Sequence, residues 1–376
     1  MEAIIIIFLI YFVLYIIYIG RLFVGYGQVK QFTPSFKQPD TRFSILIPFR
    51  NEADNLPRLL ESIKNIDYPN SHFEIILIND FSDDHSESIV YKWRVENGEI
   101  HTTMIDNVRI SGSPKKDALT RAVPIVVNEW IVTTDADCVL PEKWLRTLND
   151  YILATNALLI AGPVVYDSEK TFLQRFQQAD LLSLQAATVG SFGLNKAFMC
   201  NGANLAYKKS LFNELNGFRG NNASASGDDV FILQKAVAQY PEKVHYLLSK
   251  EALVLTRPAK NMRELFLQRV RWASKAATYN HDFGEMLALV VFLGNFTFVF
   301  FTALAIAGIV KWEITATLFI VKFIADYSLL LRANRFFRNG RFIFPVVSSL
   351  IYPFFSTTVA LYSMVWKYEW KGRKFR

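Results

Sequence analysis

The sequence predicts an α/β domain with a mostly parallel sheet, helices on both of its faces, and flanking membrane helices: one N-terminal and two to three C-terminal. Three observations predict this class. Charge-free apolar blocks lie near both ends of the chain, short apolar runs alternate with helix-period segments between them, and polar clusters directly follow those runs. The composition, 51% hydrophobic and 20% charged with two cysteines, excludes a disordered chain and a disulfide-stapled secreted fold.

The first element is an apolar segment that we assign to an N-terminal transmembrane anchor, residues 1–25. Ala3–Gly20 contains no charged side chain, and about 20 apolar residues suffice to cross a bilayer. The chain starts without the basic region of a cleaved signal peptide, so we expect the anchor to be retained. The basic residues Arg21, Lys30 and Lys37 all follow the segment, and the positive-inside rule therefore places the soluble domain in the cytoplasm.

Three apolar segments in the last quarter of the chain are the C-terminal membrane candidates. Met286–Val310 has no charge, and Phe342–Trp366 has none but contains prolines. Ile314–Leu331 is the weakest candidate because it carries Lys322 and Asp326. These two residues are four positions apart, on one helix face, so we expect them to form a neutralising pair.

The orientation of this C-terminal transmembrane region, residues 286–366, is constrained by two basic stretches. Residues 332–341 carry four arginines, and the tail 367–376 is also basic. Both stretches favour the cytoplasmic side, which is impossible if the intervening segment crosses once. Either the tail lies outside, or the proline-containing segment turns back or lies in the interface; we favour a cytoplasmic tail.

The middle of the chain, residues 40–260, is predicted to be the soluble domain. Phe43–Pro48, Phe73–Ile78 and Trp130–Thr134 are apolar runs of strand length, and Leu56–Ile66 has apolar residues at helical spacing. Alternating strands and helices predict a parallel sheet, whose ligands bind beyond the carboxyl ends of the strands. The residues directly after each strand are therefore the candidates for chemistry.

Those residues are strongly polar. Pro48–Glu52 closes the first strand, Asn79–Asp84 follows the second, and Asp135 and Asp137 follow the third. A small number of hard oxygen ligands suits Mg²⁺ or Mn²⁺ bridging to substrate phosphates. Neither glycine-rich phosphate-loop pattern, Gly-x-Gly-x-x-Gly or Gly-x-x-x-x-Gly-Lys-Ser/Thr, occurs in the chain.

An acidic pair, Asp228 and Asp229, precedes a helix-period segment. Carboxylates at a helix N-terminus are stabilised by the helix dipole, which is one reading of the pair. The other is a general base at the mouth of the site, since neighbouring carboxylates tend to raise the pKa of one of them. The local sequence leaves both readings open.

Just before the first C-terminal membrane candidate lies a segment, residues 261–285, that we expect to be interfacial. It contains Gln268, Arg271 and Trp272. Basic and aromatic residues at this place are commonly interfacial anchors. An arginine that binds a diphosphate is the alternative.

Taken together in this order, the clusters resemble the membrane-bound glycosyltransferases of family 2 with a GT-A type nucleotide-sugar domain. The resemblance covers about residues 40–280. Two positions depart from the family pattern: Asn79 replaces the first acid of the second cluster, and Phe81 replaces its usual glycine. The matching elements are Pro48–Glu52, Asn79–Asp84, Lys115–Leu119, Asp135 with Asp137, Asp228 with Asp229, and Gln268 with Arg271 and Trp272.

The resemblance implies a role for each matching residue in an inverting hexosyl transfer that uses Mg²⁺ or Mn²⁺. Asp229, with Asp228 beside it, is the implied base for the acceptor hydroxyl, and Asp137, assisted by Asp135, is the implied metal ligand. The remaining implied contacts to substrate are Glu52 and Asp80 near the uridine of a UDP-sugar, Lys115 near the diphosphate, Asn204 on the acceptor side, and Gln268, Arg271 and Trp272 over the diphosphate and acceptor end. Pro48 and Asp135 are also implied to bind substrate.

The number of membrane candidates bears on the acceptor. At most four spans are few for a polymer channel, which favours a lipid or lipid-linked acceptor that enters from the bilayer of the cytoplasmic membrane. A processive exopolysaccharide synthase is the alternative, and a non-catalytic nucleotide-binding membrane protein is a third. The net charge of +7 lies largely beside the membrane segments, so we expect membrane lipids rather than nucleic acid as partners.

Overall fold

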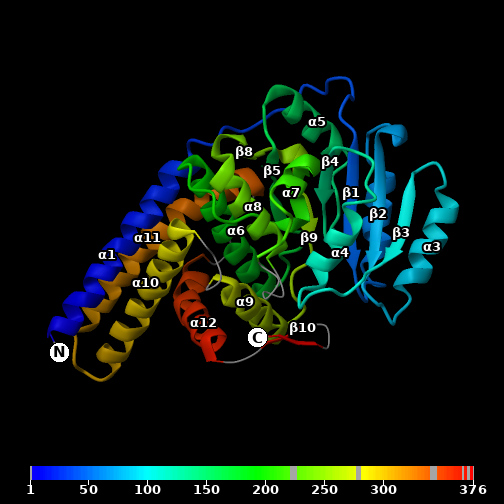
Figure 1. The fold of residues 1–376 in the computed structure, drawn as a ribbon. Coiled ribbons are helices and arrows are strands. Elements are labelled where there is room, and N and C mark those ends of the chain that lie inside the picture. Colours follow the sequence, from blue (N-terminus) through cyan, green and yellow to red (C-terminus); the bar gives the residue numbers. More distant parts are fainter. Residues whose placement is uncertain are drawn as a thin grey trace. The chain divides into compact units, whose positions relative to one another are not determined.

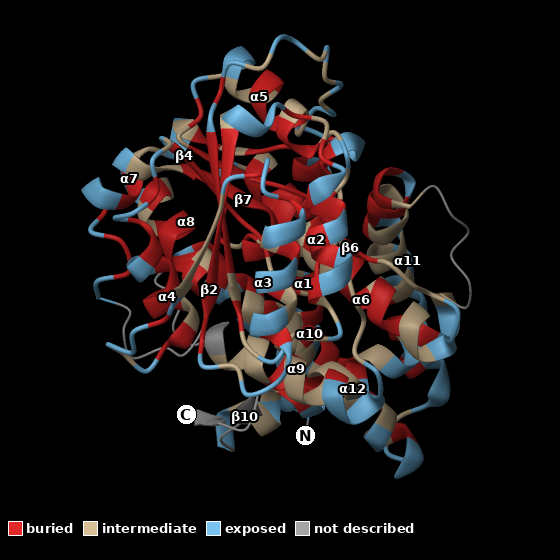
Figure 2. Cartoon of the chain, turned by 90° about the vertical axis from the view of Figure 1, so that its right-hand side faces the viewer, coloured by how far each residue is buried: buried red, intermediate tan, exposed pale blue. Residues whose placement is uncertain are grey.

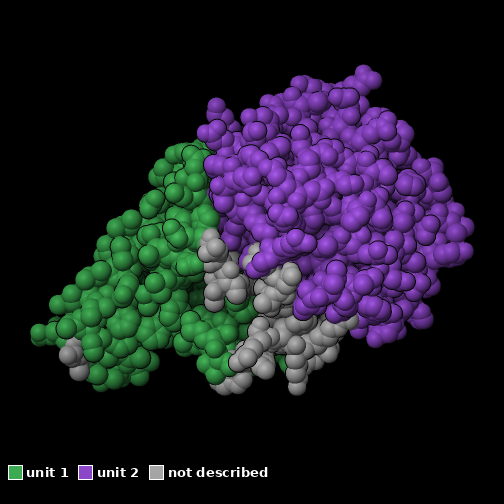
Figure 3. Space-filling model, in the orientation of Figure 1, with its two compact units in different colours: residues 1–28, 168–196, 258–376 green, residues 29–167, 197–257 purple. Residues whose placement is uncertain are grey.

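The computed structural model describes residues 2–220, 227–276, 281–338, 345–365, 368–370 and 373–375 (Figure 1). The chain forms two compact units (Figure 3). Unit 1 comprises Met1–Gln28, Ser168–Lys196 and Pro258–Arg376, and unit 2 comprises Val29–Asp167 and Ala197–Arg257. The segment Ser168–Lys196, which lies inside the predicted soluble domain 40–260, thus groups with unit 1.

Unit 2 contains a mostly parallel seven-stranded sheet with the order β3-β2-β1-β4-β7-β5-β8 among the described residues. Only β7 runs antiparallel to its neighbours β4 and β5. A separate parallel pair is formed by β6 and β9. The strands are β1 (Phe43–Phe49), β2 (Phe73–Asn79), β3 (Thr102–Asp106), β4 (Trp130–Thr133), β5 (Leu159–Ala161), β6 (Val164–Tyr166), β7 (Leu205–Lys208), β8 (Val244–Tyr246) and β9 (Val254–Thr256).

Helices cover both faces of this sheet. In Figure 2, α4, α7 and α8 lie on one side of the strands, and α2 and α3 lie on the other. The apolar residues of α2 recur at helical spacing, and Leu56, Leu59, Leu60 and Ile63 are all buried in the core against the sheet. The helices are α2 (Leu56–Lys64), α3 (Ser86–Glu96), α4 (Pro114–Ala122), α5 (Trp144–Ala154), α7 (Lys209–Glu214) and α8 (Asp228–Gln239), with 3₁₀ turns at Asn70–His72, Gly202–Asn204, Pro241–Lys243 and Lys250–Ala252.

Unit 1 is helical and holds the apolar segments. Within the described residues, four of its helices, α1, α10, α11 and α12, are long and apolar enough to cross a membrane, one before the sheet domain in sequence and three after it. This is compatible with a multi-pass membrane protein. The elements of unit 1 are α1 (Glu2–Tyr26), α6 (Phe172–Gly193), α9 (Met262–Ala276), α10 (Asp282–Ile306), α11 (Trp312–Phe337), α12 (Pro345–Val365) and the antiparallel strands β10 (Tyr368–Trp370) and β11 (Arg373–Phe375).

The proline-containing segment forms one helix, α12, which continues through Pro353. Of the features used to orient the chain, Arg341, residues 342–344 and 366, and the tail positions 367, 371, 372 and 376 lie outside the described residues. The side of the membrane on which the tail lies therefore stays a prediction.

The predicted pair between Lys322 and Asp326 is confirmed. Lys322 is 3% exposed, and its Nζ also lies 3.0 Å from the hydroxyl of Tyr15, which in turn donates to Asp326. The pair thus joins α11 to α1 inside the helical bundle. A charge inside an apolar bundle is tolerated when it is paired and hydrogen-bonded in this way.

A second contact in unit 1 depends on glycine. A Cβ atom at Gly193 would lie 1.8 Å from the carbonyl oxygen of Gly25, and one at Gly190 would lie 2.6 Å from that of Leu22. The backbones of α1 and α6 therefore approach so closely that no larger residue fits without a shift.

Candidate active site

The register of the parallel strands brings the predicted polar clusters to one edge of the sheet. Phe49 pairs with Asn79, and Asn79 pairs with Asp106, so β1, β2 and β3 end at the same level. Because β7 is antiparallel, the turn Gly202–Asn204 that precedes it enters the sheet at this same edge, beside the end of β4. The residues after four strands of unit 2 therefore converge there.

A lysine surrounded by carboxylates occupies this edge. The Nζ of Lys115 lies 2.7 Å from Oδ1 of Asp135 and 3.4 Å from Oδ2 of Asp228. Oδ2 of Asp229 accepts a hydrogen bond of 2.9 Å from the backbone N–H of Gly202. A Cβ atom at Gly202 would lie 3.2 Å from the Lys115 Nζ, so a larger residue at position 202 would crowd the ammonium group. The structure thus brings together four residues that the sequence predicted.

The electrostatics of this cluster keep the lysine charged. Burial alone would lower the pKa of Lys115, but the carboxylates of Asp135, Asp228 and Asp229 outweigh it and raise the pKa well above its usual value. Lys115 is therefore an ammonium ion at neutral pH. One cation among three carboxylates leaves the cluster net negative, which favours the addition of a further cation.

Asp135 and Asp137, the predicted metal ligands, directly follow β4. The side chain of Asp135 is 39% exposed. In the part of the chain that the structure describes, no group of three or more His, Cys, Asp or Glu side chains is placed to hold a metal ion. Mg²⁺ and Mn²⁺ are commonly held by one or two carboxylates together with substrate phosphates and water, so this sparse oxygen donor set fits such an ion.

Cys138 follows the predicted metal ligands and is buried. Burial raises the pKa of its thiol well above the usual value, and the charges of Asp137 and Asp135 raise it further. The group therefore stays a neutral thiol and offers no thiolate to a metal ion. The oxygen atoms of the aspartates remain the hard ligands here.

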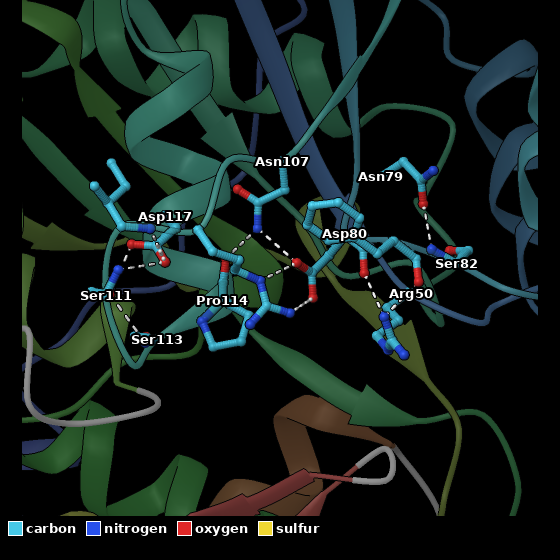
Figure 4. Close-up of polar contacts among 12 residues, drawn as sticks. Arg50, Asn79, Asp80, Ser82, Asn107, Ser111, Ser113, Pro114 and Asp117 are labelled. Atoms are coloured by element: carbon cyan, nitrogen blue, oxygen red, sulfur yellow. Dashed lines mark hydrogen bonds and ion pairs between the residues drawn. The ribbon is translucent and has the colours of Figure 1, made fainter.

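Asp80, at the end of β2, is buried in a network that the sequence did not predict (Figure 4). Its Oδ1 accepts hydrogen bonds from Nδ2 of Asn107 at 2.8 Å and from Nε of Arg109 at 2.7 Å, and its Oδ2 accepts one from Nη2 of Arg109 at 2.9 Å. Nη1 of Arg50 donates to the backbone carbonyl of Asp80 at 2.8 Å. Asn107 and Arg109 follow β3, whose half-exposed residues give no apolar run from which that strand could be predicted.

The loop between β3 and α4 connects this network to the lysine cluster. The carboxylate of Asp117 accepts hydrogen bonds from the backbone N–H and the hydroxyl of Ser111, at 3.0 and 2.7 Å (Figure 4). Nδ2 of Asn107 also donates to the carbonyl of Pro114 at 3.0 Å. Because Lys115 is the next residue, these bonds fix the start of α4 and thereby the lysine.

The two predicted residues of the first cluster lie at and beyond the end of β1. Pro48 pairs in register with Ile78 of β2. The Oε2 of Glu52 accepts a hydrogen bond of 2.6 Å from Asn55, and its backbone N–H donates to Ser86 at 2.8 Å. Glu52 thus links the end of β1 to the starts of α2 and α3.

Asn204 is buried, at 2% exposure, and its amide is bonded by the protein. Its Oδ1 accepts from Nε1 of Trp144 at 3.0 Å, and its Nδ2 donates to the carbonyls of Pro163 and Ala252 at 2.9 and 2.8 Å. A Cβ atom at Gly162 would lie 2.4 Å from this Nδ2. These contacts give Asn204 a supporting role in the loop, and its contact with substrate stays a prediction.

The remaining predicted residues, Gln268, Arg271 and Trp272, lie on α9 of unit 1. The structure connects two of them through Arg269, which the sequence did not single out. Arg269 is 6% exposed and forms an ion pair with Asp180 of α6. Its Cζ lies 4.1 Å from the centroid of the Trp272 ring, and its Nη1 donates to Oε1 of Gln268.

Comparison with known families agrees with this architecture. Residues 44–215 match the family described as Glycosyl transferase family 2, and residues 130–366 match Glycosyl transferase family group 2. The chain belongs to glycosyl transferase family group 2. The family resemblance inferred from the sequence motifs is thereby confirmed.

Relatives and one solved structure extend the comparison. The chain is 26% identical over 240 residues to Probable glycosyltransferase YdaM of Bacillus subtilis, covering 62% of this chain and 54% of that protein. It is 20% identical over 230 residues to glycosyltransferase AglE of Haloferax volcanii, covering 61% and 70%. The chain thus spans about half the length of YdaM.

The mannosyltransferase PcManGT from Pyrobaculum calidifontis, solved in complex with GDP-Man and Mn²⁺, has a similar fold. The TM-score is 0.62 at 18% sequence identity, and the match covers 97% of this chain and 99% of that one. The predicted fold class, a GT-A type sheet with flanking apolar helices, is confirmed.

Proposed function

We propose that this chain is an inverting glycosyltransferase that moves a sugar from a nucleotide-sugar donor to a lipid or lipid-linked acceptor. The observation that carries the proposal is the Lys115 cluster, in which an ammonium ion and three carboxylates lie at the carboxyl edge of a GT-A type sheet. Positive charge is needed there for the leaving diphosphate and a base is needed for the acceptor hydroxyl. The Lys115 ammonium, together with the divalent cation that the net negative cluster favours, would supply the positive charge, and a carboxylate of the cluster would supply the base.

The diphosphate side of the reaction is assigned to Lys115. Its ammonium group, held by Asp135 and Asp228, would bind the diphosphate oxygens and stabilise the charge that develops when the bond to the sugar breaks. A divalent cation, Mg²⁺ or Mn²⁺, held by Asp137 and Asp135 would add to this charge neutralisation. The complex of PcManGT with GDP-Man and Mn²⁺ supports the choice of a divalent ion.

The base is assigned to Asp229. Each carboxylate oxygen has two lone pairs, so Oδ2 can accept from the Gly202 N–H and still take a proton. In a single displacement the acceptor oxygen forms the new bond to the anomeric carbon, the bond to the diphosphate breaks, and the hydroxyl proton passes to Asp229. Asp228 lies 3.4 Å from the Nζ of Lys115 and fixes that residue.

The donor is assigned from the family pattern and the acceptor from the apolar helices. We propose a UDP-sugar, with Glu52 and Asp80 near the uridine, Pro48 also in contact with substrate, and Gln268, Arg271 and Trp272 toward the diphosphate and acceptor end. Four apolar helices support an acceptor that enters from the membrane, with unit 2 in the cytoplasm and the chain in the cytoplasmic membrane. A processive exopolysaccharide synthase is the alternative, and the size of the product separates the two.

The test is release of nucleoside diphosphate by the full chain in lipid nanodiscs, with a panel of UDP- and GDP-sugars, with and without divalent metal. We expect turnover of one donor that needs the metal, that Asp137→Ala abolishes and that Asp229→Asn lowers about 10²–10⁴-fold. Asp67→Asn is the matched control, because Asp67 is a half-exposed carboxylate that pairs only at the surface with Arg146. If no donor is bound or turned over, the proposal is wrong.

A further inference from the structure

Phe81, one of the two departures from the family pattern, has an unusual conformation. Its side chain is 55% exposed, and its backbone φ is 57°, in the left-handed region that favours glycine. A large side chain in such a conformation is disfavoured and persists only when its surroundings fix it, often at binding sites. An exposed ring on a strained backbone is therefore a candidate for a contact with ligand.

The surroundings do fix the backbone of Phe81. Nη1 of Arg50 donates to the carbonyl oxygens of both Asp80 and Phe81. The backbone N–H of Ser82 donates to Oδ1 of Asn79 at 3.0 Å, so the second departure, Asn79, helps to close the same turn (Figure 4). The two departures from the family pattern thus act on one turn at the end of β2.

The ring of Phe81 also has a fixed neighbour. The Cζ of Arg109 lies 5.9 Å from its centroid, within the range of a cation–π contact. Arg109 is itself held by the two hydrogen bonds to the buried Asp80. The exposed ring and the guanidinium together form a platform, Phe81 with Arg109, at the edge of the sheet where ligands of this fold bind.

We propose that the ring of Phe81, held beside the Arg109 guanidinium that Asp80 fixes, stacks on the base of the bound nucleotide. This proposal rests on the proposed function, because it presumes a nucleotide donor. Bases stack on aromatic rings and on guanidinium planes, and this stacking tolerates any base because each has a flat face. Phe81 is then a binding residue, and Asp80 and Arg109 are its positioning residues.

The test is calorimetric binding of UDP, GDP and inorganic pyrophosphate, each with Mg²⁺, to the full chain in nanodiscs. Phe81→Gly removes the ring and suits the left-handed backbone, so we expect a folded protein. The Kd of both nucleotides should rise about ten-fold or more, whereas that of pyrophosphate, which has no base, should not change. Phe81→Trp should retain tight nucleotide binding.

The matched control is Tyr91→Ala, which removes an exposed aromatic ring from α3 and should leave the Kd of UDP, GDP and pyrophosphate unchanged. Arg109→Lys keeps a charge beside Asp80 but loses the two-pronged contact, and should weaken nucleotide binding without affecting pyrophosphate. If Phe81→Gly binds nucleotides with an unchanged Kd, the stacking proposal is wrong but the proposed function stands. The same holds if the Kd of pyrophosphate rises as much as that of the nucleotides. If wild type binds no nucleotide, the proposed function fails with it.

Discussion

Replacement of the assigned base, Asp229→Asn, should lower the rate of sugar transfer while the fold and donor binding are kept. The amide that replaces the carboxylate keeps one oxygen, which can accept the 2.9 Å hydrogen bond from the backbone N–H of Gly202. It loses the second acceptor oxygen, which in Asp229 accepts a 2.9 Å hydrogen bond from the backbone N–H of Val230. Lys115 also keeps its contacts to Asp135 at 2.7 Å and Asp228 at 3.4 Å. The variant should therefore fold and bind donor, but it has no group to take the acceptor proton.

The size of the effect follows from the loss of this one function. General base catalysis contributes about 10²–10⁴-fold to a rate, which corresponds to about 3–5 kcal/mol in the activation barrier. We expect kcat to fall by this factor, with the donor KM and the thermal midpoint close to those of wild type. Removal of one of three carboxylates beside Lys115 leaves the lysine charged.

The assay is the steady-state release of nucleoside diphosphate in nanodiscs, with donor titrated at saturating acceptor. Asp67→Asn, which removes a carboxylate elsewhere in unit 2, should keep the wild-type kcat. A kcat for Asp229→Asn within about three-fold of wild type, a change of under 1 kcal/mol, would refute the assignment of the base. A fall in thermal midpoint larger than the loss of the single Val230 hydrogen bond explains would refute the argument that the site keeps its architecture.

Four other predictions concern donor binding by Lys115, the stability provided by Asn204 and Gly162, and the reactivity of Cys138. Lys115→Met should raise the donor Kd about 10- to 100-fold, the value of a hydrogen bond to a charged group, measured by calorimetry. Asn204→Ala leaves three buried polar groups without their partner, and should lower the free energy of unfolding by about 3 kcal/mol or more. Gly162→Ala, whose Cβ would meet the Asn204 amide, should cost about 1–3 kcal/mol; thermal or denaturant unfolding in nanodiscs measures both. Because burial and nearby carboxylates raise the pKa of Cys138, it should resist alkylation at about pH 8, near the pKa of a free thiol, until the protein is unfolded; labelling of the native chain at this residue would contradict that cause.

The strands that could be predicted are those whose apolar runs are continuous. The runs Phe43–Pro48, Phe73–Ile78 and Trp130–Thr134 correspond to β1, β2 and β4, which are buried along almost their whole length. Strand β3, Thr102–Asp106, was not predicted, because its residues are half-exposed or exposed and its sequence shows no alternation of apolar and polar residues. A strand at the edge of a sheet is defined by its partner, which the local sequence does not show.

The same reasoning separates the predicted site residues from those that were missed. Asp135 could be found because it follows a strand that is apparent from sequence. Arg109 could not, because its contact with Asp80 depends on the pairing of β2 with the unrecognised β3. The supporting contacts of Asn204 could not be predicted either, because its bond to Trp144, 60 positions away, is visible only in the fold.

The central claim, transfer of a sugar to a membrane acceptor, is tested most directly by following a radiolabelled sugar. The full chain in nanodiscs made with native lipid extract would be given the turned-over donor and Mg²⁺ or Mn²⁺. We expect label to move into the lipid-extractable fraction as a product with one added sugar, and Asp229→Asn to stop this transfer. Label that stays in the nucleotide sugar, or appears only as free sugar, would contradict it.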